Sequence, residues 1–124
     1  MTSTHRVLVI EDDELIRDSL VEYLGDQGYQ AMGAVDGLDA LAKLRGGDPL
    51  PCVMVLDLMM PNMDGRSFRE EQRRDATLAA IPVIVLSAYR DVAKNAAELA
   101  VEDYLAKPLK LQVLLELVKK HCRV

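Results

Sequence analysis

Five short apolar segments alternate with five segments of helical periodicity along this chain of 124 residues. Residues 52–56 form the clearest strand, because they are apolar without alternating and should be buried on both faces. Regular alternation of strand and helix indicates a parallel sheet, covered by helices on both faces and joined by right-handed crossovers. The other strands are predicted at residues 7–10, 29–35, 81–86 and 101–105, and the helices at about 13–25, 36–45, 64–74, 91–99 and 111–121.

The strand composition predicts the order of the sheet. The two most apolar strands should be central, whereas the second and fifth are weaker and should lie at the edges. This favours the order 2-1-3-4-5 of a flavodoxin-like, doubly wound (βα)5 three-layer sandwich of the α/β class. The length suits one domain, so we expect residues 1–124 to form a single unit.

The composition excludes several classes of protein. A net charge of -5 without a basic block argues against direct nucleic-acid binding by this domain. No apolar run approaches the ~18 residues that a membrane-spanning helix requires, and the N-terminal apolar run is too short for a signal peptide. We therefore expect a cytoplasmic protein without a membrane segment. Cys52 and Cys122 are too few for a disulfide framework and are interpreted as structural thiols.

Four of the five predicted strands are followed by polar residues that could share one site. Glu11 and Asp12 follow the first, Asp57 the third, Ser87 the fourth and Lys107 the fifth. In the predicted order these four strands are neighbours, and ligands bind at the carboxyl edge of such a sheet. We therefore expect all five side chains to converge on one site.

The residue types at this edge indicate metal-assisted phosphoryl transfer. Crowded carboxylates repel one another unless a cation joins them, and oxygen ligands without His or Cys favour Mg²⁺. Lys107 offers a positive charge, and the hydroxyl of Ser87 can donate a hydrogen bond to a phosphoryl oxygen. The nucleophile would be the central carboxylate of Asp57, which would form an acyl phosphate.

The acidic run after the first strand allows two registers. Either Glu11 and Asp12, or Asp12 and Asp13, could point into the site. The first pair follows the apolar run directly and is the pair that we expect there. Asp13 is then predicted to cap the first helix, as Asp64 is predicted to cap the third.

Five short motifs, each common by itself, occur here in one order. They are Glu11-Asp12, Asp57, Met60-Pro61-Asn62-Met63-Asp64-Gly65, Ser87-Ala88 and Tyr104-Leu105-Ala106-Lys107-Pro108. Together, and at these spacings, the motifs are highly specific. The chain resembles a response-regulator receiver domain of two-component signalling, similar to the chemotaxis response regulator, and the resemblance covers essentially the whole sequence.

The resemblance implies a role for each site residue. Asp57 would accept a phosphoryl group from a phosphohistidine on a histidine kinase or a histidine phosphotransfer protein. Asp12, Asp57 and the backbone carbonyl of Met59 would bind Mg²⁺, or Mn²⁺ in its place, and Glu11 would act through water. Lys107 would pair with Asp57 and then with the phosphoryl group.

The resemblance also implies a switch. Ser87 would move to hydrogen-bond the phosphoryl group, and Tyr104 would swing inward to fill the space that is vacated. The face of the fourth helix, fifth strand and fifth helix would then bind a downstream protein or output domain, with the chain a monomer or a phosphorylation-dependent dimer. The domain would be a switch rather than an enzyme, catalysing only its own phosphorylation and slow dephosphorylation. The bond between Lys107 and Pro108 is expected to be cis.

Two features of the sequence depart from the family pattern, and a third lies outside the predicted site. Ala100-Val101 stands where many receivers have Gly-Ala, which leaves open how the fourth helix ends without a left-handed glycine. Leu109 replaces a frequent aromatic residue and is interpreted as a conservative core change. The basic residues of the third helix are predicted to form its solvated face, and they are Arg66, Arg69, Arg73 and Arg74.

Three rival functions fit the same residues less well. A haloacid-dehalogenase-like phosphatase would place a second Asp two positions after the first, where this chain has Met59. A flavodoxin would have a first loop rich in Ser and Thr, whereas Glu11-Asp12-Asp13-Glu14 would repel a phosphate. A receiver-like scaffold without phosphorylation usually lacks a site residue, and none is missing here. The sequence is either a stand-alone receiver or one part of a longer protein.

Overall fold

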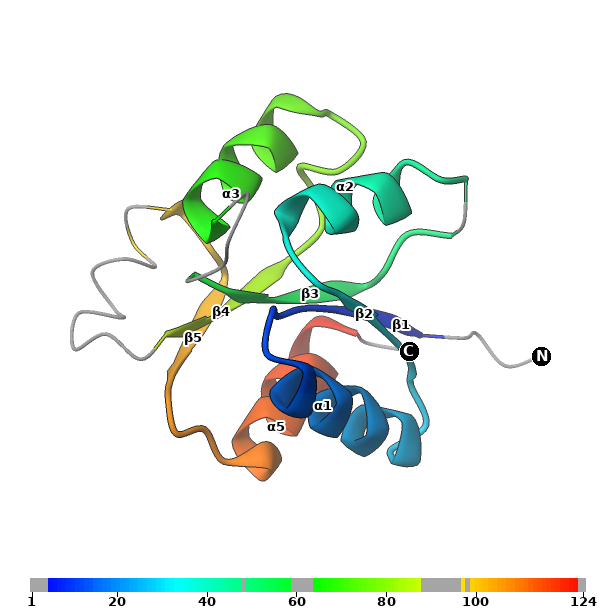
Figure 1. Cartoon of the computed structure of the whole chain (residues 1–124), viewed down its shortest axis with the longest axis vertical. Coiled ribbons are helices and arrows are strands. Elements are labelled where there is room, and N and C mark those ends of the chain that lie inside the picture. Colours follow the sequence, from blue (N-terminus) through cyan, green and yellow to red (C-terminus); the bar gives the residue numbers. More distant parts are fainter. Residues whose placement is uncertain (1–4, 48, 59–63, 88–96, 98, 123–124) are drawn as a thin grey trace.

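The fold is a five-stranded parallel sheet with helices on both faces (Figure 1). The computed structural model describes residues 5–47, 49–58, 64–87, 97 and 99–122. The strand order is β2-β1-β3-β4-β5, which confirms the predicted flavodoxin-like arrangement. The strands are β1 (Arg6–Ile10), β2 (Gln30–Ala34), β3 (Val53–Asp57), β4 (Val83–Ser87) and β5 (Asp103–Ala106).

Helices α1 and α5 cover one face of the sheet, and α2 and α3 cover the other (Figure 1). The bounds are α1 (Glu14–Asp26), α2 (Gly37–Leu44), α3 (Gly65–Arg74) and α5 (Leu111–His121). The helix predicted at residues 91–99 lies mostly outside the described residues, of which Ala97 and Leu99 are helical. Among the helices of the described ranges, none is long and apolar enough to cross a membrane.

The central strands are buried on both sides. Every residue of β3 and β4 is buried. Along β3, Met54 and Leu56 join the core beneath α2 and α3, whereas Val53 and Val55 join the core beneath α1 and α5. The two cores together hold the carboxyl end of β3 in place. Leu109 is partly buried against the core beneath α1 and α5, which agrees with its interpretation as a core residue.

Three aspartates begin helices through the same contact. Each accepts a hydrogen bond from the backbone N–H three residues further on, which satisfies one of the unpaired donors of a helix N-terminus. These caps confirm the predicted starts, including the assignment of Asp13 to the helix rather than the site. The donors lie at 3.0 Å from Asp13, 2.8 Å from Asp36 and 2.9 Å from Asp64.

Two strands begin two residues later than predicted. β4 starts at Val83 because Pro82 has no N–H for a sheet ladder, although the Pro82 carbonyl accepts the N–H of Met54 at 2.9 Å. β5 starts at Asp103, because the side chain of Glu102 accepts the Val83 N–H at 2.9 Å. A side chain thus takes up a hydrogen bond that an earlier start of β5 could have made.

The prediction that all four arginines of α3 are solvated was wrong for Arg69. Its side chain is buried, as is that of Gln72 three residues later, whereas Arg66, Arg73 and Arg74 are exposed. The periodicity of the helix places residues 65, 68, 69 and 72 on the inner face, so a charged residue lies on that face among apolar neighbours.

The interpretation of the cysteines as free thiols was also wrong. Cys52, which precedes β3, forms a disulfide with Cys122, which follows α5. Their Cα atoms are 5.2 Å apart, a separation usual for disulfides. The two residues are 70 positions apart in the sequence, so their meeting depends on where α5 ends on the sheet.

The loop after β3 and the start of α3 approach each other closely at Gly65. A Cβ atom at this position would lie 2.8 Å from the Cα of Leu58 and 3.0 Å from the carbonyl oxygen of Asp57. Backbone atoms cannot move aside as the end of a side chain can, so only glycine fits here.

We therefore expect Gly65→Ala to lower the free energy of unfolding by about 1–3 kcal/mol, as overpacking does elsewhere. The matched control is Gly25→Ala in α1, where an added Cβ meets nothing within 4 Å. That change should be neutral or stabilising by up to about 1 kcal/mol. Urea unfolding measures both, and equal stabilities for the two variants would contradict the assignment.

The end of α5 is also held to the sheet by Asp103, the first residue of β5. Its Oδ2 lies 2.7 Å from Nε2 of His121 and 3.2 Å from Nζ of Lys120. Partial burial would raise the pKa of Asp103, but these two hydrogen bonds outweigh burial and lower the pKa below 3.8. The ionised carboxylate is therefore the form that stabilises the fold.

A lowered folded-state pKa means that this stabilisation is present above the unfolded pKa and is lost as the pH falls through the folded pKa. We expect Asp103→Asn to cost about 0.2–1 kcal/mol of stability at pH 7, since the pair is partly exposed to solvent. The difference from wild type should shrink below about pH 4. Urea unfolding between pH 7 and pH 3 measures it, with the exposed Asp18→Asn as control. A difference that stays constant across this range would refute the electrostatic role.

Candidate functional site

The register of the parallel strands brings the predicted residues to one edge of the sheet. Asp57 and Ser87 are the last residues of the neighbouring strands β3 and β4, and Glu11 directly follows β1. Ser87 faces Ala106, the last residue of β5, so Lys107 lies one position beyond. The backbone N–H of Lys107 donates to the carbonyl of Ser87 at 2.9 Å.

Three carboxylates meet at this edge. Glu11, Asp12 and Asp57 each offer an oxygen atom, and these atoms lie within 4.8 Å of one another. Glu11 and Asp57 are buried, whereas Asp12 is exposed. The cluster therefore has a dry side formed by the sheet and a side open to solvent.

Lys107 places its ammonium group against two of these acids. Its Nζ atom lies 3.3 Å from Oε1 of Glu11 and 3.5 Å from Oδ2 of Asp57. One ammonium group cannot neutralise three carboxylates. The arrangement thus leaves excess negative charge in a partly dry environment, which is costly without a further positive charge.

The pKa of Glu11 reflects this excess of negative charge. Burial, followed by the neighbouring carboxylate of Asp57, raises the pKa of Glu11 to about 8, although Lys107 acts in the opposite direction. The second oxygen of Glu11, Oε2, is buried and has no hydrogen-bond partner within the described ranges. A divalent cation held by the carboxylates would supply both the charge and a partner. The cluster fits a hard cation, because all its donors are oxygen atoms.

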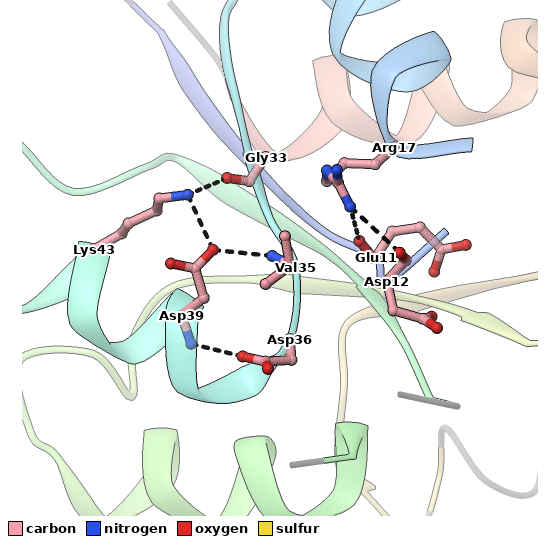
Figure 2. A network of polar contacts seen from close by, with 8 residues as sticks. All are labelled: Glu11, Asp12, Arg17, Gly33, Val35, Asp36, Asp39 and Lys43. Atoms are coloured by element: carbon pink, nitrogen blue, oxygen red, sulfur yellow. Dashed lines mark hydrogen bonds and ion pairs between the residues drawn. The ribbon is translucent and has the colours of Figure 1, made fainter. Parts of the chain in front are cut away.

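Arg17 of α1 holds the backbone of the acidic loop, which is formed by Glu11 and Asp12 (Figure 2). Its Nη1 atom donates to the backbone carbonyls of Glu11 at 3.0 Å and Asp12 at 3.4 Å. A Cβ atom at Gly33 would lie 2.8 Å from Cδ of Arg17, so glycine on β2 leaves room for this side chain. The sequence motifs did not predict this contact, which depends on how α1 crosses β2.

A second polar network secures the corner between β2 and α2 (Figure 2). Nζ of Lys43 donates to the carbonyl of Gly33 at 2.6 Å and to Asp39 at 3.0 Å. Asp39 in turn accepts the N–H of Val35 at 2.9 Å. These contacts fix β2 against the α2 side, and β2 carries the glycine that accommodates Arg17.

The remaining predicted residues are placed as follows. Ser87 is buried at the end of β4. Tyr104 lies on β5 with 46% of its surface exposed, so its side chain is outside the core. The bond between Lys107 and Pro108 is cis, as predicted. Met59 lies outside the described residues.

The fold and the site together define a class of protein. A flavodoxin-like sheet whose carboxyl edge carries three acids and a lysine defines an α/β domain with a candidate divalent-cation site beside a fixed positive charge. Comparison with known families gives the particular one. The family described as response regulator receiver domain matches residues 7–119, and this chain belongs to that family.

Individual relatives agree with this membership. Response regulator RR06 of Streptococcus pneumoniae serotype 2 is 37% identical over 118 residues, which cover 91% of this chain and 51% of that protein. A response regulator receiver protein from Pseudomonas putida superimposes with a TM-score of 0.86 at 31% identity, covering 97% of this chain and 99% of that one. Response regulator TrrA of Thermotoga maritima, solved in complex with Mg²⁺-BeF, gives a TM-score of 0.81 at 31% identity, with coverage of 94% and 98%.

The chain spans about half the length of the curated relatives that it matches. It is a receiver domain of two-component response regulators, a class of signalling switches that interact with histidine kinases and output domains. Its acidic residues Glu11, Asp12 and Asp57 are compatible with a divalent metal ion.

The two acids after Glu11 allow a matched test of the metal site. We expect Asp12→Asn to weaken divalent-cation binding by about tenfold or more, because it removes a charged oxygen ligand. Asp13→Asn removes the same charge one residue away but keeps a helix cap, since Asn caps as well as Asp. It should change the affinity little. Titration with Mn²⁺, followed by electron paramagnetic resonance, measures both, and equal losses would contradict the assignment.

Proposed function

We propose that this domain accepts a phosphoryl group on Asp57 from a phosphohistidine of a histidine kinase or histidine phosphotransfer protein. The observation that carries the proposal is the position of Asp57. Its carboxylate ends a fully buried strand, shares a cluster with Glu11 and Asp12, and lies 3.5 Å from the ammonium of Lys107. A nucleophile, a cation site and a fixed positive charge thus occupy one place.

The proposed transfer is an in-line displacement at phosphorus. A carboxylate oxygen of Asp57 forms the new O–P bond as the P–N bond to the donor imidazole breaks, and the imidazole nitrogen keeps the electron pair and is then protonated. Positioning and charge neutralisation do most of the work in such reactions. Lys107 is placed to pair with the added phosphoryl oxygens, and the hydroxyl of Ser87 to donate a hydrogen bond to one of them.

Mg²⁺ is the proposed metal, with Mn²⁺ able to replace it. Asp12 and Asp57 would bind it directly with the backbone carbonyl of Met59, and Glu11 would act through water. The metal would neutralise charge on the phosphoryl oxygens. The all-oxygen cluster and the unsatisfied Oε2 of Glu11 support this choice, as does TrrA, which was solved with Mg²⁺-BeF.

The proposed output is a change in the conformation of Ser87 and Tyr104, which alters the surface that includes β5 and α5. Ser87 would move towards the phosphoryl group, and Tyr104, now 46% exposed, would turn inward. The face that includes β5 and α5 would then bind a downstream protein or an output domain, as a monomer or a phosphorylation-dependent dimer. We propose that residues 1–124 form one receiver domain that acts in the cytoplasm and does not act as an enzyme on other substrates.

Labelling by acetyl phosphate in the presence of Mg²⁺ tests the nucleophile. We expect wild type to gain one phosphoryl group, seen by intact mass, and Asp57→Asn to gain none, because the amide is not a nucleophile. Chelation of the metal should also abolish labelling. Asp64→Asn is the control, since it removes a nearby acid but keeps the cap of α3. Labelling of Asp57→Asn at the wild-type rate would sink the proposal.

A further inference from the structure

Arg69 is a buried charge that the proposed phosphorylation chemistry does not use. It is 5% exposed on the inner face of α3. Its guanidinium donates three hydrogen bonds: Nε to the carbonyl of Leu99 at 3.0 Å, Nη2 to the carbonyl of Ala100 at 2.6 Å, and Nη1 to Oε1 of Gln72 at 2.7 Å. Two of these bonds cross from α3 to the segment that precedes β5.

Gln72 extends this network without contacting solvent. It is completely buried, and its Nε2 donates to the carbonyls of Leu78 at 2.9 Å and Ile81 at 3.0 Å. Burial lowers the pKa of Arg69, while Glu102 raises it and Arg73 lowers it further. A guanidinium nevertheless stays charged in proteins. A buried charge with several bonds to backbone carbonyls joins two segments more firmly than apolar packing, which has no direction.

The carbonyls that Arg69 holds lie at the end of a helical turn. Ala100 has a φ of 53°, in the left-handed region, and its N–H donates to the carbonyl of Ala97 at 3.2 Å. A residue with a Cβ atom seldom adopts this conformation. The chain thus ends the turn with Ala100 where glycine would be easier, and two bonds from Arg69 hold the backbone there.

One end of this connection reaches the phosphorylation site. α3 begins at Gly65, where an added Cβ atom would lie only 2.8 Å from the Cα of Leu58, the residue after Asp57. The N–H of Gly65 also donates to the carbonyl of Leu58 at 3.2 Å. A shift of the backbone at Asp57 and Leu58 would therefore move the start of α3, because no space exists to absorb it.

The other end reaches the proposed switch strand. Ala100 leads to Glu102, whose side chain accepts the N–H of Val83 at 2.9 Å, and then into β5 with Tyr104. In Figure 1 the segment before β5 lies beside α3, on the side away from α1 and α5. A continuous series of contacts thus runs from Leu58, the residue after Asp57, through α3 and Arg69 to Ala100, which leads into β5.

We propose that Arg69 is a positioning residue that couples phosphorylation of Asp57 to β5 through α3. The coupling reaches β5 at its first residue, whereas Ser87 lies beside its last residue, Ala106. The coupling deepens the proposed function, on which it rests. Arg69 touches neither the phosphoryl group nor the metal. It makes the turn at Ala100 move with α3, so that a change in the loop after Asp57 reaches the strand that carries Tyr104.

The test compares binding with response, using Mg²⁺ and beryllofluoride as a mimic of the phosphoryl group. Binding is measured by calorimetry, and the response is the change in backbone amide chemical shifts of Asp103–Ala106 at saturation. We expect Arg69→Gln to bind beryllofluoride within about threefold of wild type, while the shift changes in β5 fall to less than half. A purely structural residue would not separate these two readouts. Arg69→Lys, which keeps the charge but not the fork of donors, should lie between.

Arg73→Gln is the matched control, because it makes the same change on the exposed face of the same helix. It should retain the full response. Wild-type shift changes in Arg69→Gln, or an equal reduction in Arg73→Gln, would overturn the coupling alone. A wild-type protein that does not bind beryllofluoride with Mg²⁺ would overturn the proposed function and the coupling with it.

A measurement on the wild type covers the case in which Arg69→Gln does not fold. The Nε–H resonance of Arg69 reports the bond to Leu99 directly. It should shift on saturation with beryllofluoride, together with the amides of β5. An unchanged resonance at saturation would overturn the coupling without any variant.

Discussion

The packing of apolar side chains against both faces of β3 is the interaction on which the structure of this domain depends, because it holds Glu11, Asp12 and Asp57 together beside Lys107. Carboxylates in a partly dry environment repel each other, so a rigid framework must hold them together. The framework is the parallel sheet: β3 is buried throughout, and cores on both sides keep its end in place. The favourable packing of the two cores thus offsets the repulsion between the acids at the carboxyl edge of the sheet.

This unfavourable cluster is also what gives the site its chemistry. Burial and the carboxylate of Asp57 raise the pKa of Glu11, and its Oε2 atom has no hydrogen-bond partner among the described residues. Both observations indicate that the site has too little positive charge. A cation would relieve both, and an incoming phosphoryl group would meet the ammonium of Lys107 on the same side. The site therefore combines an acidic cluster compatible with a divalent cation and a positive charge that suits the phosphoryl group of the proposed function.

Residues outside the site decide how it is held and where a change in it can go. Arg17 binds the carbonyls of the acidic loop, and glycine at position 33 leaves it room. Arg69 joins α3 to the turn before β5. Both arginines bind backbone carbonyls rather than acids, so they fix the course of the main chain. Protein cores shift between discrete arrangements rather than deform smoothly, and such fixed points determine which segments move together.

Much of the fold and the centre of the site followed from local patterns in the sequence. The apolar run before Asp57, the spacing of strands and helices, and the polar residues after each strand predicted the sheet order and the meeting of Glu11, Asp12, Asp57 and Lys107. Caps such as Asp13 were predictable because they involve neighbours in the chain. These features depend on interactions within a few residues, or on rules that all parallel sheets obey.

Other features depended on the tertiary structure, because their partners are distant in sequence. Arg69 looked like one more surface arginine of a charged helix, and only the position of Leu99 and Ala100 gives it a buried role. Cys52 and Cys122 form a disulfide because α5 ends beside the start of β3. Thus the sequence alone determined which residues form the reactive edge, through periodicity and strand ends. The tertiary structure decided which polar groups are buried and bound, because burial is a property of the packed chain and not of a residue.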